Sequence, residues 1–455
     1  MATLHNPVLL ASKATLLTST TPVRAVEDVV DAAQARYIQR HPVSRDLHEK
    51  ALKCMPGGNT RSVLHSDPFP ICQKRGRENK LWDHDGHQYL DLVGELTAGL
   101  YGHSNPRLRE VIVSTFDNVG MNLGGTTQEE SRLAGLLCER FPNIQQLRFC
   151  NSGTEANIYA LSIARHITGR RKIIVFEGGY HGGVLSFGHG IGANNVDQDD
   201  WVLGTYNDVE SATALIKNTP GVAAVVVEAM QGAGGCIPAT LEFLHGIQAA
   251  AKEAGIIFML DEVMTSRLYP GGLARKLQVS PDLTTLGKYI GGGMAFGAFG
   301  GSEALLSCYD PRVTRSLPHS GTFNNNTLAM SLGFVGLSEI YTSAVNLELN
   351  ELGDWFRGAL QQIAEGTKMV VIGVGAALTV HFLENGKVPT NAHEIEENNL
   401  PQLKKLFWFW CLERGFWVTE RGMLSLILGT TKEELGEFVG TVKEFAEEYS
   451  DFLTL

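Results

Sequence analysis

The sequence lacks both the excess of basic charge and the long apolar stretch that would suggest a nucleic-acid or membrane partner. Its 38 Lys and Arg residues are outnumbered by 49 Asp and Glu residues, which gives a formal net charge of -11. No long basic block interrupts this acidic background, so a phosphate backbone would find little to bind. No apolar run approaches the roughly 18 residues needed to cross a bilayer. We therefore predict neither nucleic acid nor membrane as a partner.

Paired cysteines are also missing. The seven cysteines are scattered, odd in number and free of any Cys-x-x-Cys pair, which indicates reduced thiols and a reducing compartment. Residues 1–24 contain Lys13 and Arg24, several Ser and Thr, and no acidic residue. We interpret this segment as a disordered leader that is not cleaved, on a cytoplasmic protein. A mitochondrial targeting peptide is the alternative.

A dinucleotide-binding fingerprint is absent although the chain has 50 glycines. No Gly-x-Gly-x-x-Gly ends a predicted strand with an acidic residue about 20 positions later. The missing fingerprint argues against a nicotinamide dehydrogenase. The glycines instead predict tight turns and places where the backbone approaches a ligand closely.

What the sequence does contain is a regular alternation of strands and helices. A chain of 455 residues exceeds the size of one hydrophobic core, so we predict a large and a small domain. The alternation over 91–330 is typical of an α/β domain with a mainly parallel sheet. The segment 331–455 predicts a smaller α+β domain, which we expect residues 25–90 to join.

Four local features are specific enough to be checked. A helical pattern between Arg24 and Cys54 is interrupted at Pro42. Residues 423–428 predict a strand, and Thr431 with Glu434 predicts a capping box at the start of the last long helix. The helix that follows residue 153 is expected to bury one face, made of Ile158, Leu161, Ala164 and Ile167.

Lys288 is the leading candidate for a catalytic residue. It is the single charge in an apolar stretch with glycine on both sides. A lysine in a dry site has a lowered pKa, which frees its lone pair to attack a carbonyl such as the aldehyde of pyridoxal phosphate. The alternative is an exposed lysine in a turn.

Two predicted buried strands end in acidic residues, at Glu228 and at Asp261. Open α/β sheets bind their ligands at the carboxyl ends of the strands. Asp261 is the better candidate for a functional carboxylate, because the pyridinium nitrogen of a buried cofactor needs an anion to stay protonated. The alternative is that Asp261 caps a helix. The 27 positions from Asp261 to Lys288 allow a crossover and a return strand, so both could reach one crevice.

An anion site is predicted where a strand runs into a helix at Ser152, Gly153 and Thr154. Free backbone N–H groups and the positive helix end point at the same spot there. An ordinary helix N-cap is the alternative. Tyr180 lies between glycines, which would let a planar ligand stack on its ring, whereas a buried core tyrosine is equally compatible with the pattern.

A metal site is not predicted. Asp83, His84, Asp85 and His87 surround a predicted hairpin turn, but we expect their side chains to point to different sides of it. We interpret them as a solvated hairpin tip.

Taken in order, these motifs resemble the class III pyridoxal-phosphate aminotransferases of fold type I, over nearly the whole chain from about residue 45. The similarity is greatest to the β-amino-acid (β-phenylalanine) aminotransferases, with the glutamate-1-semialdehyde aminomutase branch next. The matching segments are Asn151–Ala156, Gly178–Gly182, Glu228–Gly232, Asp261–Val263 and Gly287–Lys288.

The resemblance implies a role for each matching residue. Lys288 would hold the cofactor as a Schiff base and move the proton, and Asp261 would pair with the ring nitrogen, supported by Glu228. Tyr180 and Val263 would contact the two ring faces. The phosphate would be bound by Ser152, Gly153 and Thr154, together with Thr322 of the partner subunit of a homodimer with shared active sites.

The resemblance also implies the substrates. Arg61 and Arg421 match positions that bind substrate carboxylates, although salt bridges to local acids such as Glu420 are the alternative. We predict an aminotransferase that moves an amino group from a β-amino acid to a keto acid such as 2-oxoglutarate or pyruvate. An aminomutase-like enzyme, an ω-amine transaminase and a non-catalytic binding protein of the same fold are the alternatives.

Overall fold

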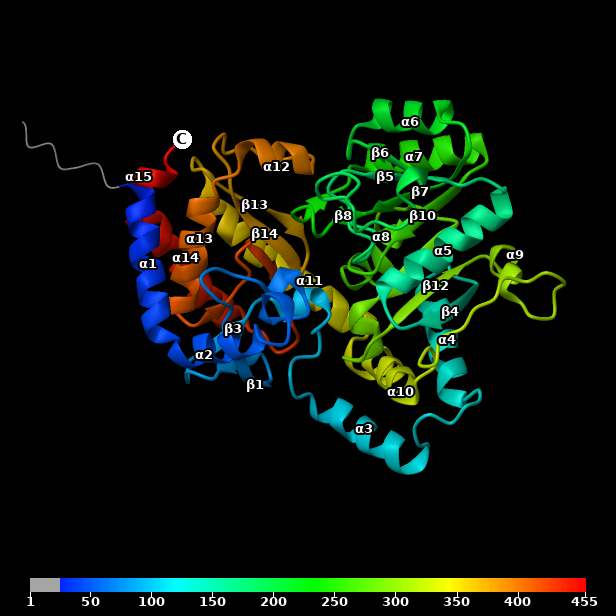
Figure 1. Cartoon of the computed structure of the whole chain (residues 1–455), viewed down its shortest axis with the longest axis horizontal. Coiled ribbons are helices and arrows are strands. Elements are labelled where there is room, and N and C mark those ends of the chain that lie inside the picture. Colours follow the sequence, from blue (N-terminus) through cyan, green and yellow to red (C-terminus); the bar gives the residue numbers. More distant parts are fainter. Residues whose placement is uncertain (1–24) are drawn as a thin grey trace, which may run out of the picture.

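The computed structural model describes residues 25–455, so the predictions for residues 1–24 lie outside the described residues. In Figure 1 a large domain lies on the right and a smaller one on the left. The long helix α11 (Ser343–Ala364) lies between them. This is the predicted division into a large and a small domain.

The large domain is built on a seven-stranded sheet in the order β4-β12-β11-β10-β7-β5-β6. Strand β12 runs antiparallel to both of its neighbours, and the other neighbouring pairs are parallel. The mainly parallel α/β sheet is therefore confirmed. Its strands are β4 (Gln146–Cys150), β5 (Lys172–Phe176), β6 (Trp201–Gly204), β7 (Val222–Glu228), β10 (Ile257–Asp261), β11 (Leu283–Gly287) and β12 (Gly297–Gly301).

Helices cover both faces of this sheet, which is why its strands read as continuous apolar runs. Along β7, Val225 and Val227 pack in one hydrophobic cluster with helices α6 (Val209–Asn218) and α7 (Leu241–Ala254). Val226 belongs to a second cluster with helix α5 (Gly153–Thr168). The other helices and short strands of this part of the chain are α3 (Pro106–Asn118), α4 (Gln128–Arg140), β8 (Met230–Gln231), β9 (Ile237–Pro238), α8 (Gly272–Lys276), α9 (Glu303–Leu306) and α10 (Thr327–Val335).

The predicted buried face of α5 is wrong in part. Ile158 and Ile167 are exposed, at 36% and 47%, whereas Leu161 and Ala164 are buried as expected. The helix lies close against β11 and β12, and small side chains allow that approach better than isoleucines. The contact is made by Ala156, Ala160, Leu161, Ile163 and Ala164.

The N-terminal and C-terminal segments pack together. Strand β15 (Phe416–Trp417) pairs in parallel with β3 (Gln88–Asp91), and helix α1 (Val26–Arg40) contacts α13 (Pro401–Glu413). Figure 1 shows the blue helix beside the orange and red ones. The domain boundaries at residues 90 and 330 themselves stay a prediction.

The remaining elements of the small domain agree with the predicted helices and strands. One residue, His41, separates the end of α1 from the start of α2 (Pro42–Ala51), which is the break predicted at Pro42. The capping box of α14 (Lys432–Glu448) is present. The other elements are β1 (Gln73–Arg77), β2 (Lys80–Asp83), β13 (Met369–Val374), β14 (Ala377–Phe382), α12 (Ala392–Asn398), β16 (Met423–Ser425) and α15 (Ser450–Leu453).

Strand β16 is shorter than the predicted 423–428. The N–H groups of Leu426 and Leu428 donate to the carbonyls of Ala376 and Leu100 instead of continuing the ladder with β14. The strand therefore gives way to an extended segment that joins the two domains.

Within residues 25–455, no single helix has the length and apolarity to span a membrane. Thr327–Ile340 and Ser343–Ala364 meet that criterion only as a pair, bent by 74°.

Candidate functional site

Several chain segments that carry predicted site residues meet at one edge of the large sheet. Asp261 ends β10 and lies directly opposite Glu228 at the end of β7 and Thr285 near the end of β11. Lys288 follows β11 immediately. The carboxyl ends of these strands thus form the ligand-binding edge that an open α/β sheet provides.

Lys288 is partly buried, and its amine has two acceptors in a neighbouring turn. Nζ donates to the carbonyl oxygen of Leu96 at 2.7 Å and to Oγ1 of Thr97 at 3.0 Å. Burial lowers the pKa of Lys288 to about 8, although the negative charges of Glu228 and Asp261 act to raise it. This matches the lowered pKa expected of a desolvated amine, and a useful fraction of the amine is neutral near physiological pH.

Asp261 is held by three hydrogen bonds. Its Oδ2 accepts from Nδ2 of Asn157 at 2.8 Å and from Nδ1 of His181 at 2.9 Å, and its Oδ1 accepts from the N–H of Val263 at 3.0 Å. Asn157 is fixed in turn by the hydroxyl of Thr285, which donates to its Oδ1 at 2.8 Å. The carboxylate is therefore a rigid, buried anion, as partnering a ring nitrogen requires.

His181 and Asn157 are functional candidates that sequence reasoning missed. Burial disfavours protonation of His181, but its hydrogen bond to Asp261 and the charges of Asp261 and Glu228 outweigh burial and raise its pKa. The sequence offers only weak signals for a function of these two residues. Asn157 is a buried polar residue in the first turns of α5, and His181 follows Tyr180 in the glycine-flanked segment.

Glu228 does not support Asp261 in the way predicted. Its carboxylate accepts the backbone N–H of Tyr180 and that of Gly232, both at 3.0 Å. Burial raises the pKa of Glu228 to about 7. Glu228 therefore fixes the backbone that carries Tyr180, and it influences Asp261 only through charge.

The start of α5 has the form of the predicted anion site. Oγ of Ser152 caps the helix by accepting the N–H of Glu155 at 3.2 Å. The N–H groups of Gly153 and Thr154 have no hydrogen-bond partner within the described part of the chain. Two backbone donors at a helix N-terminus suit a phosphate group.

Tyr180 and Val263 are placed as a planar ligand would need. The side chain of Tyr180 is 46% exposed, so it is not the buried core tyrosine of the alternative reading. Val263 lies between two glycines: a Cβ on Gly153 would be 2.9 Å from its methyl groups, and one on Gly287 would be 3.1 Å away. Together with the amine and the fixed anion, these residues fit pyridoxal phosphate.

The two predicted carboxylate-binding arginines differ. Arg61 forms an ion pair with Glu95, so the local salt bridge that was the alternative is present there. Arg421 has no acid within ion-pair distance among residues 25–455, Glu420 included. Burial lowers the pKa of Arg421, and the charges of Cys236 and Tyr180 oppose that shift. Arg421 is thus the arginine left free for a ligand.

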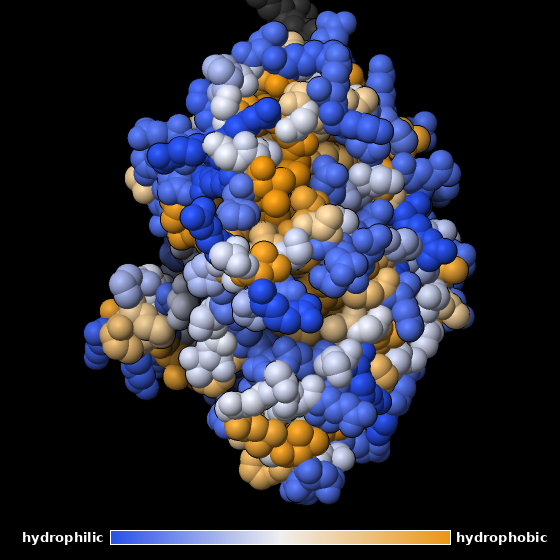
Figure 2. Space-filling view, turned by 90° about the vertical axis from the view of Figure 1, so that its right-hand side faces the viewer, coloured by the Kyte–Doolittle hydropathy of each residue, from blue (hydrophilic) through white to orange (hydrophobic). Residues whose placement is uncertain are grey.

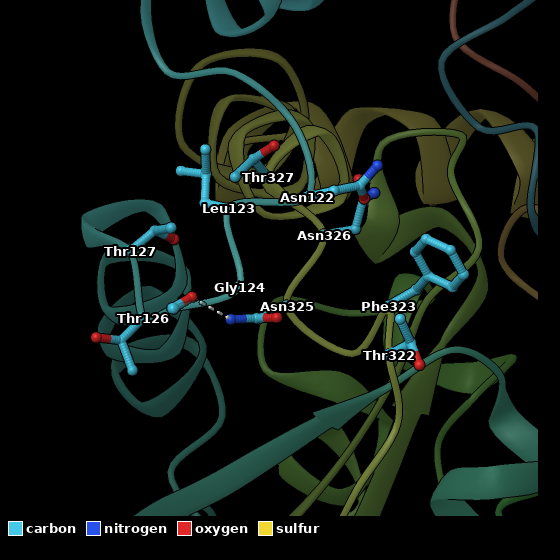
Figure 3. Close-up of a pocket in the computed structure, with 11 residues that line it drawn as sticks. Asn122, Leu123, Gly124, Thr126, Thr127, Thr322, Phe323, Asn325, Asn326 and Thr327 are labelled. Atoms are coloured by element: carbon cyan, nitrogen blue, oxygen red, sulfur yellow. Dashed lines mark hydrogen bonds between the residues drawn. The ribbon is translucent and has the colours of Figure 1, made fainter.

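Thr322 forms no hydrogen bond with another predicted site residue of the described chain, although Asn324, two positions later, accepts from Nδ2 of Asn151 at 2.9 Å. It is exposed in the wall of a cavity of about 360 Å³, and none of the other predicted residues within the described chain lines that cavity. Figure 3 shows Thr322 and Phe323 on one side of this cavity and the segment 122–127 across from them.

The residues around the hairpin turn converge more than expected. Nδ1 of His87 donates to Oδ2 of Asp83 at 2.9 Å, and one ligand atom each from His41, Asp83 and His87 lie within 4.8 Å of one another. Asp83 is buried and also accepts from the hydroxyl of Tyr89 at 2.7 Å. Nε2 of His41, the residue between α1 and α2, lies 3.2 Å from the hydroxyl of Tyr89 and ties that break to the hairpin β2–β3, which gives the cluster a structural role.

Comparison with known proteins gives consistent results. The family model described as "Aminotransferase class-III" matches residues 62–188 and 192–437. An uncharacterised aminotransferase of Schizosaccharomyces pombe is 49% identical over 413 residues, which cover 91% of this chain and 94% of that protein. The β-phenylalanine transaminase of Variovorax paradoxus is 44% identical over 424 residues, 92% of this chain and 96% of that protein.

Solved structures extend the similarity to three dimensions. The β-phenylalanine aminotransferase from Variovorax paradoxus has a TM-score of 0.92 at 43% identity, covering 94% of this chain and 99% of that chain. An ω-transaminase from Sphaerobacter thermophilus has a TM-score of 0.83 at 31% identity, covering 90% of this chain and 98% of that chain. Both domains take part in these matches.

Proposed function

Because this chain belongs to the class III aminotransferases, which use pyridoxal phosphate, we propose that it moves the amino group of a β-amino acid to a keto acid such as 2-oxoglutarate or pyruvate. The observation that carries the substrate class is the 44% identity, over 92% of the chain, to the β-phenylalanine transaminase of Variovorax paradoxus. The reaction would proceed in two halves, with the amino group held on the enzyme between them.

Each residue of the sheet edge then has a task. The bound cofactor supplies an electron sink. Lys288 anchors it and moves the proton at the carbon that carries the amino group. Asp261, kept rigid by Asn157 and His181, holds negative charge at the ring nitrogen. The N–H groups at the start of α5 bind the phosphate.

The carboxylate of the substrate would be bound chiefly by Arg421. Its guanidinium has no competing acid within residues 25–455, and the desolvation that lowers its pKa would strengthen its hold on a carboxylate. Arg61 would contribute less, because a carboxylate must compete for it with Glu95. A planar guanidinium can hold a carboxylate through two parallel hydrogen bonds.

A panel of donors and acceptors tests this proposal. The donors are β-phenylalanine, glutamate-1-semialdehyde and a simple arylalkylamine, each with pyruvate or 2-oxoglutarate. We expect Arg421→Ala to raise KM for β-phenylalanine about 10- to 100-fold, the equivalent of one charged hydrogen-bonded pair. The arylalkylamine, which has no carboxylate, should be unaffected.

Arg45→Ala removes an exposed arginine of α2 that pairs with its neighbour Asp46, and it serves as the matched control. If the wild-type enzyme used the arylalkylamine as well as β-phenylalanine, the ω-amine transaminase alternative would replace the β-amino-acid proposal. Conversion of glutamate-1-semialdehyde without a keto acid would favour the aminomutase alternative.

We also propose that the enzyme is a homodimer whose subunits share their active sites. Apolar side chains lie exposed around the cavity that contains Thr322: Met121 at 39%, Leu123 at 54% and Phe323 at 56%. Exposed apolar groups that cluster in this way are typical of protein interfaces. Figure 2 shows further apolar side chains breaking the hydrophilic surface on the side that lies to the right in Figure 1.

Mixing two inactive variants tests the shared site. We expect Lys288→Ala and Thr322→Asp each to be inactive alone. In a mixed dimer one of the two sites would combine an intact Lys288 with the partner's intact Thr322, so a random mixture should regain about a quarter of the wild-type activity. A mixture that stays inactive, or a Thr322→Asp enzyme that is fully active alone, would contradict the shared site.

A cytoplasmic location is a further proposal. All seven cysteines are free in the structure, which supports a reducing compartment. Cell fractionation with an antibody to the native chain tests it.

A further inference from the structure

The turn that binds the amine of Lys288 has an unusual backbone. After Gly94, with φ of 51°, the three residues Glu95, Leu96 and Thr97 have φ values of 49°, 52° and 78°. A left-handed conformation costs a residue with a Cβ about 1–2 kcal/mol. Three such residues in a row persist only where the surrounding structure imposes them, and such places cluster at functional sites.

Contacts on both sides impose this conformation. Before the turn, Oδ1 of Asp91 accepts the N–H groups of Val93 and Gly94 at 2.8 Å and 3.0 Å. Gly94 lies so close to the segment after β16 that a Cβ on it would be 2.6 Å from Ile427.

Behind the turn lies a buried arginine. Nη1 of Arg267 donates to the carbonyl of Thr97 at 3.2 Å and to Oγ of Ser425 at 3.0 Å, and its Nη2 donates to the carbonyl of Leu426. Arg267 is fully buried. Its hydrogen bonds join the large domain, the turn and the small domain, so the position of the turn is fixed from three directions.

These contacts place two hydrogen-bond acceptors next to one amine. The carbonyl of Leu96 and the hydroxyl of Thr97 are 2.7 Å and 3.0 Å from Nζ of Lys288. Thr97 is completely buried, so water does not compete for its hydroxyl. Lys288 itself has a φ of 52°, so both sides of the contact are held in left-handed backbone.

The geometry has a chemical consequence for a neutral amine, which carries two N–H bonds and one lone pair. When both N–H bonds point at Leu96 and Thr97, the lone pair points away from the turn. A lysine that removes a proton from carbon needs its lone pair free and directed. In that step a new N–H bond forms at Nζ while the C–H bond breaks, and the bonding pair stays with the substrate joined to the cofactor.

We propose that Thr97 is a positioning residue: its hydroxyl, with the Leu96 carbonyl, orients Nζ of Lys288 so that the lone pair faces the reacting carbon. The proposal rests on the aminotransferase function and on the assignment of Lys288, and it is independent of which amine is the donor.

The test compares Thr97→Val with Thr97→Ser. Valine has the shape of threonine without the hydroxyl, and serine keeps the hydroxyl, so serine is the matched control. With the best donor of the panel we expect Thr97→Val to lower kcat about 10- to 100-fold with little change in KM, while Thr97→Ser stays within about threefold of wild type.

A second measurement does not depend on turnover. The full-length chain freed of cofactor is mixed with pyridoxal phosphate between pH 6 and 10, and the rate at which the yellow absorption develops is recorded. Capture needs the neutral amine, so the wild-type midpoint should lie near pH 8. Loss of an acceptor destabilises the ammonium form, so Thr97→Val should shift the midpoint about one unit lower, and Thr97→Ser should not shift it.

The proposal would be overturned if both variants behaved like the wild type in the two measurements. It would also be overturned if valine and serine caused the same loss. If Thr97→Val fails to fold, as judged by circular dichroism, Thr97→Ala against Thr97→Ser gives the same comparison. Failure of the wild-type chain to capture pyridoxal phosphate at all would instead count against the assignment of Lys288, so the two failures can be told apart.

Discussion

Replacing Asn157 by leucine tests the network that fixes Asp261. Nδ2 of Asn157 donates to Oδ2 of Asp261 and to the carbonyl of His181, both at 2.8 Å, and its Oδ1 accepts from Thr285. Leucine has a similar volume and none of these polar groups. All three partners are buried, so water cannot replace the amide.

The magnitude follows from these three bonds. A hydrogen bond to a charged group contributes about 1.5–3 kcal/mol, and a buried polar group left without a partner costs about 1–3 kcal/mol. We therefore expect Asn157→Leu to lower the free energy of unfolding by about 3–6 kcal/mol. Asp261 would keep two of its three donors, and the loss of one corresponds to about a 10- to 100-fold lower rate of the first half-reaction.

Two assays separate the effects. Urea unfolding of the cofactor-loaded enzyme, followed by tryptophan fluorescence, gives stability, and stopped-flow absorbance of the cofactor gives the half-reaction. Thr285→Val is the control, because it removes one partner of Asn157 and leaves Asp261 untouched; it should cost about 1 kcal/mol. An Asn157→Leu enzyme that is less than about 1 kcal/mol destabilised and reacts within about threefold of wild type would refute the reasoning.

Three further predictions follow from the same structure. Lys288→Ala should abolish transamination and let the cofactor dialyse away while circular dichroism stays unchanged; substantial residual turnover would show that another residue serves as the base. Asp261→Asn should lower the half-reaction rate at least about 100-fold, as for other preorganised electrostatic groups, and a near-normal rate would mean that the ring nitrogen has a different partner. Thr431→Ala removes the cap of α14 and should cost about 1 kcal/mol in urea unfolding without changing kcat, whereas an unchanged midpoint would show that the capping box contributes no stability.

The sequence predicted those site residues whose place depends on the order of strands. Asp261 and Lys288 lie at the ends of apolar strands. The backbone of a parallel sheet brings such ends to one edge, independently of how individual side chains are oriented. The close approaches predicted at glycines are also present, because Gly153 and Gly287 leave the space that Val263 fills.

Residues that act through contacts distant in sequence could not be predicted. Thr97 lies 191 positions before Lys288 and 170 positions before Arg267, and only the folded structure brings it to both. The pairing of Arg61 with Glu95 and the convergence of Asp83 with His87 depend on side-chain directions at turns, which no periodicity encodes. The buried face of α5 was misjudged because large apolar residues were taken as the contact, whereas close helix–sheet packing selects alanine.

The pairing of β3 with β15, and of α1 with α13, has a consequence for biosynthesis. Residues 26–91 leave the ribosome long before their partners, which lie about 330 to 370 positions later, have been made. Until α13 emerges, Tyr37 of α1 lacks two of the rings that pack against it, Trp408 and Phe409, so the apolar side of α1 stays partly uncovered. A chain that ends before α13 should therefore aggregate or be degraded rapidly, and it should not be a partly active enzyme.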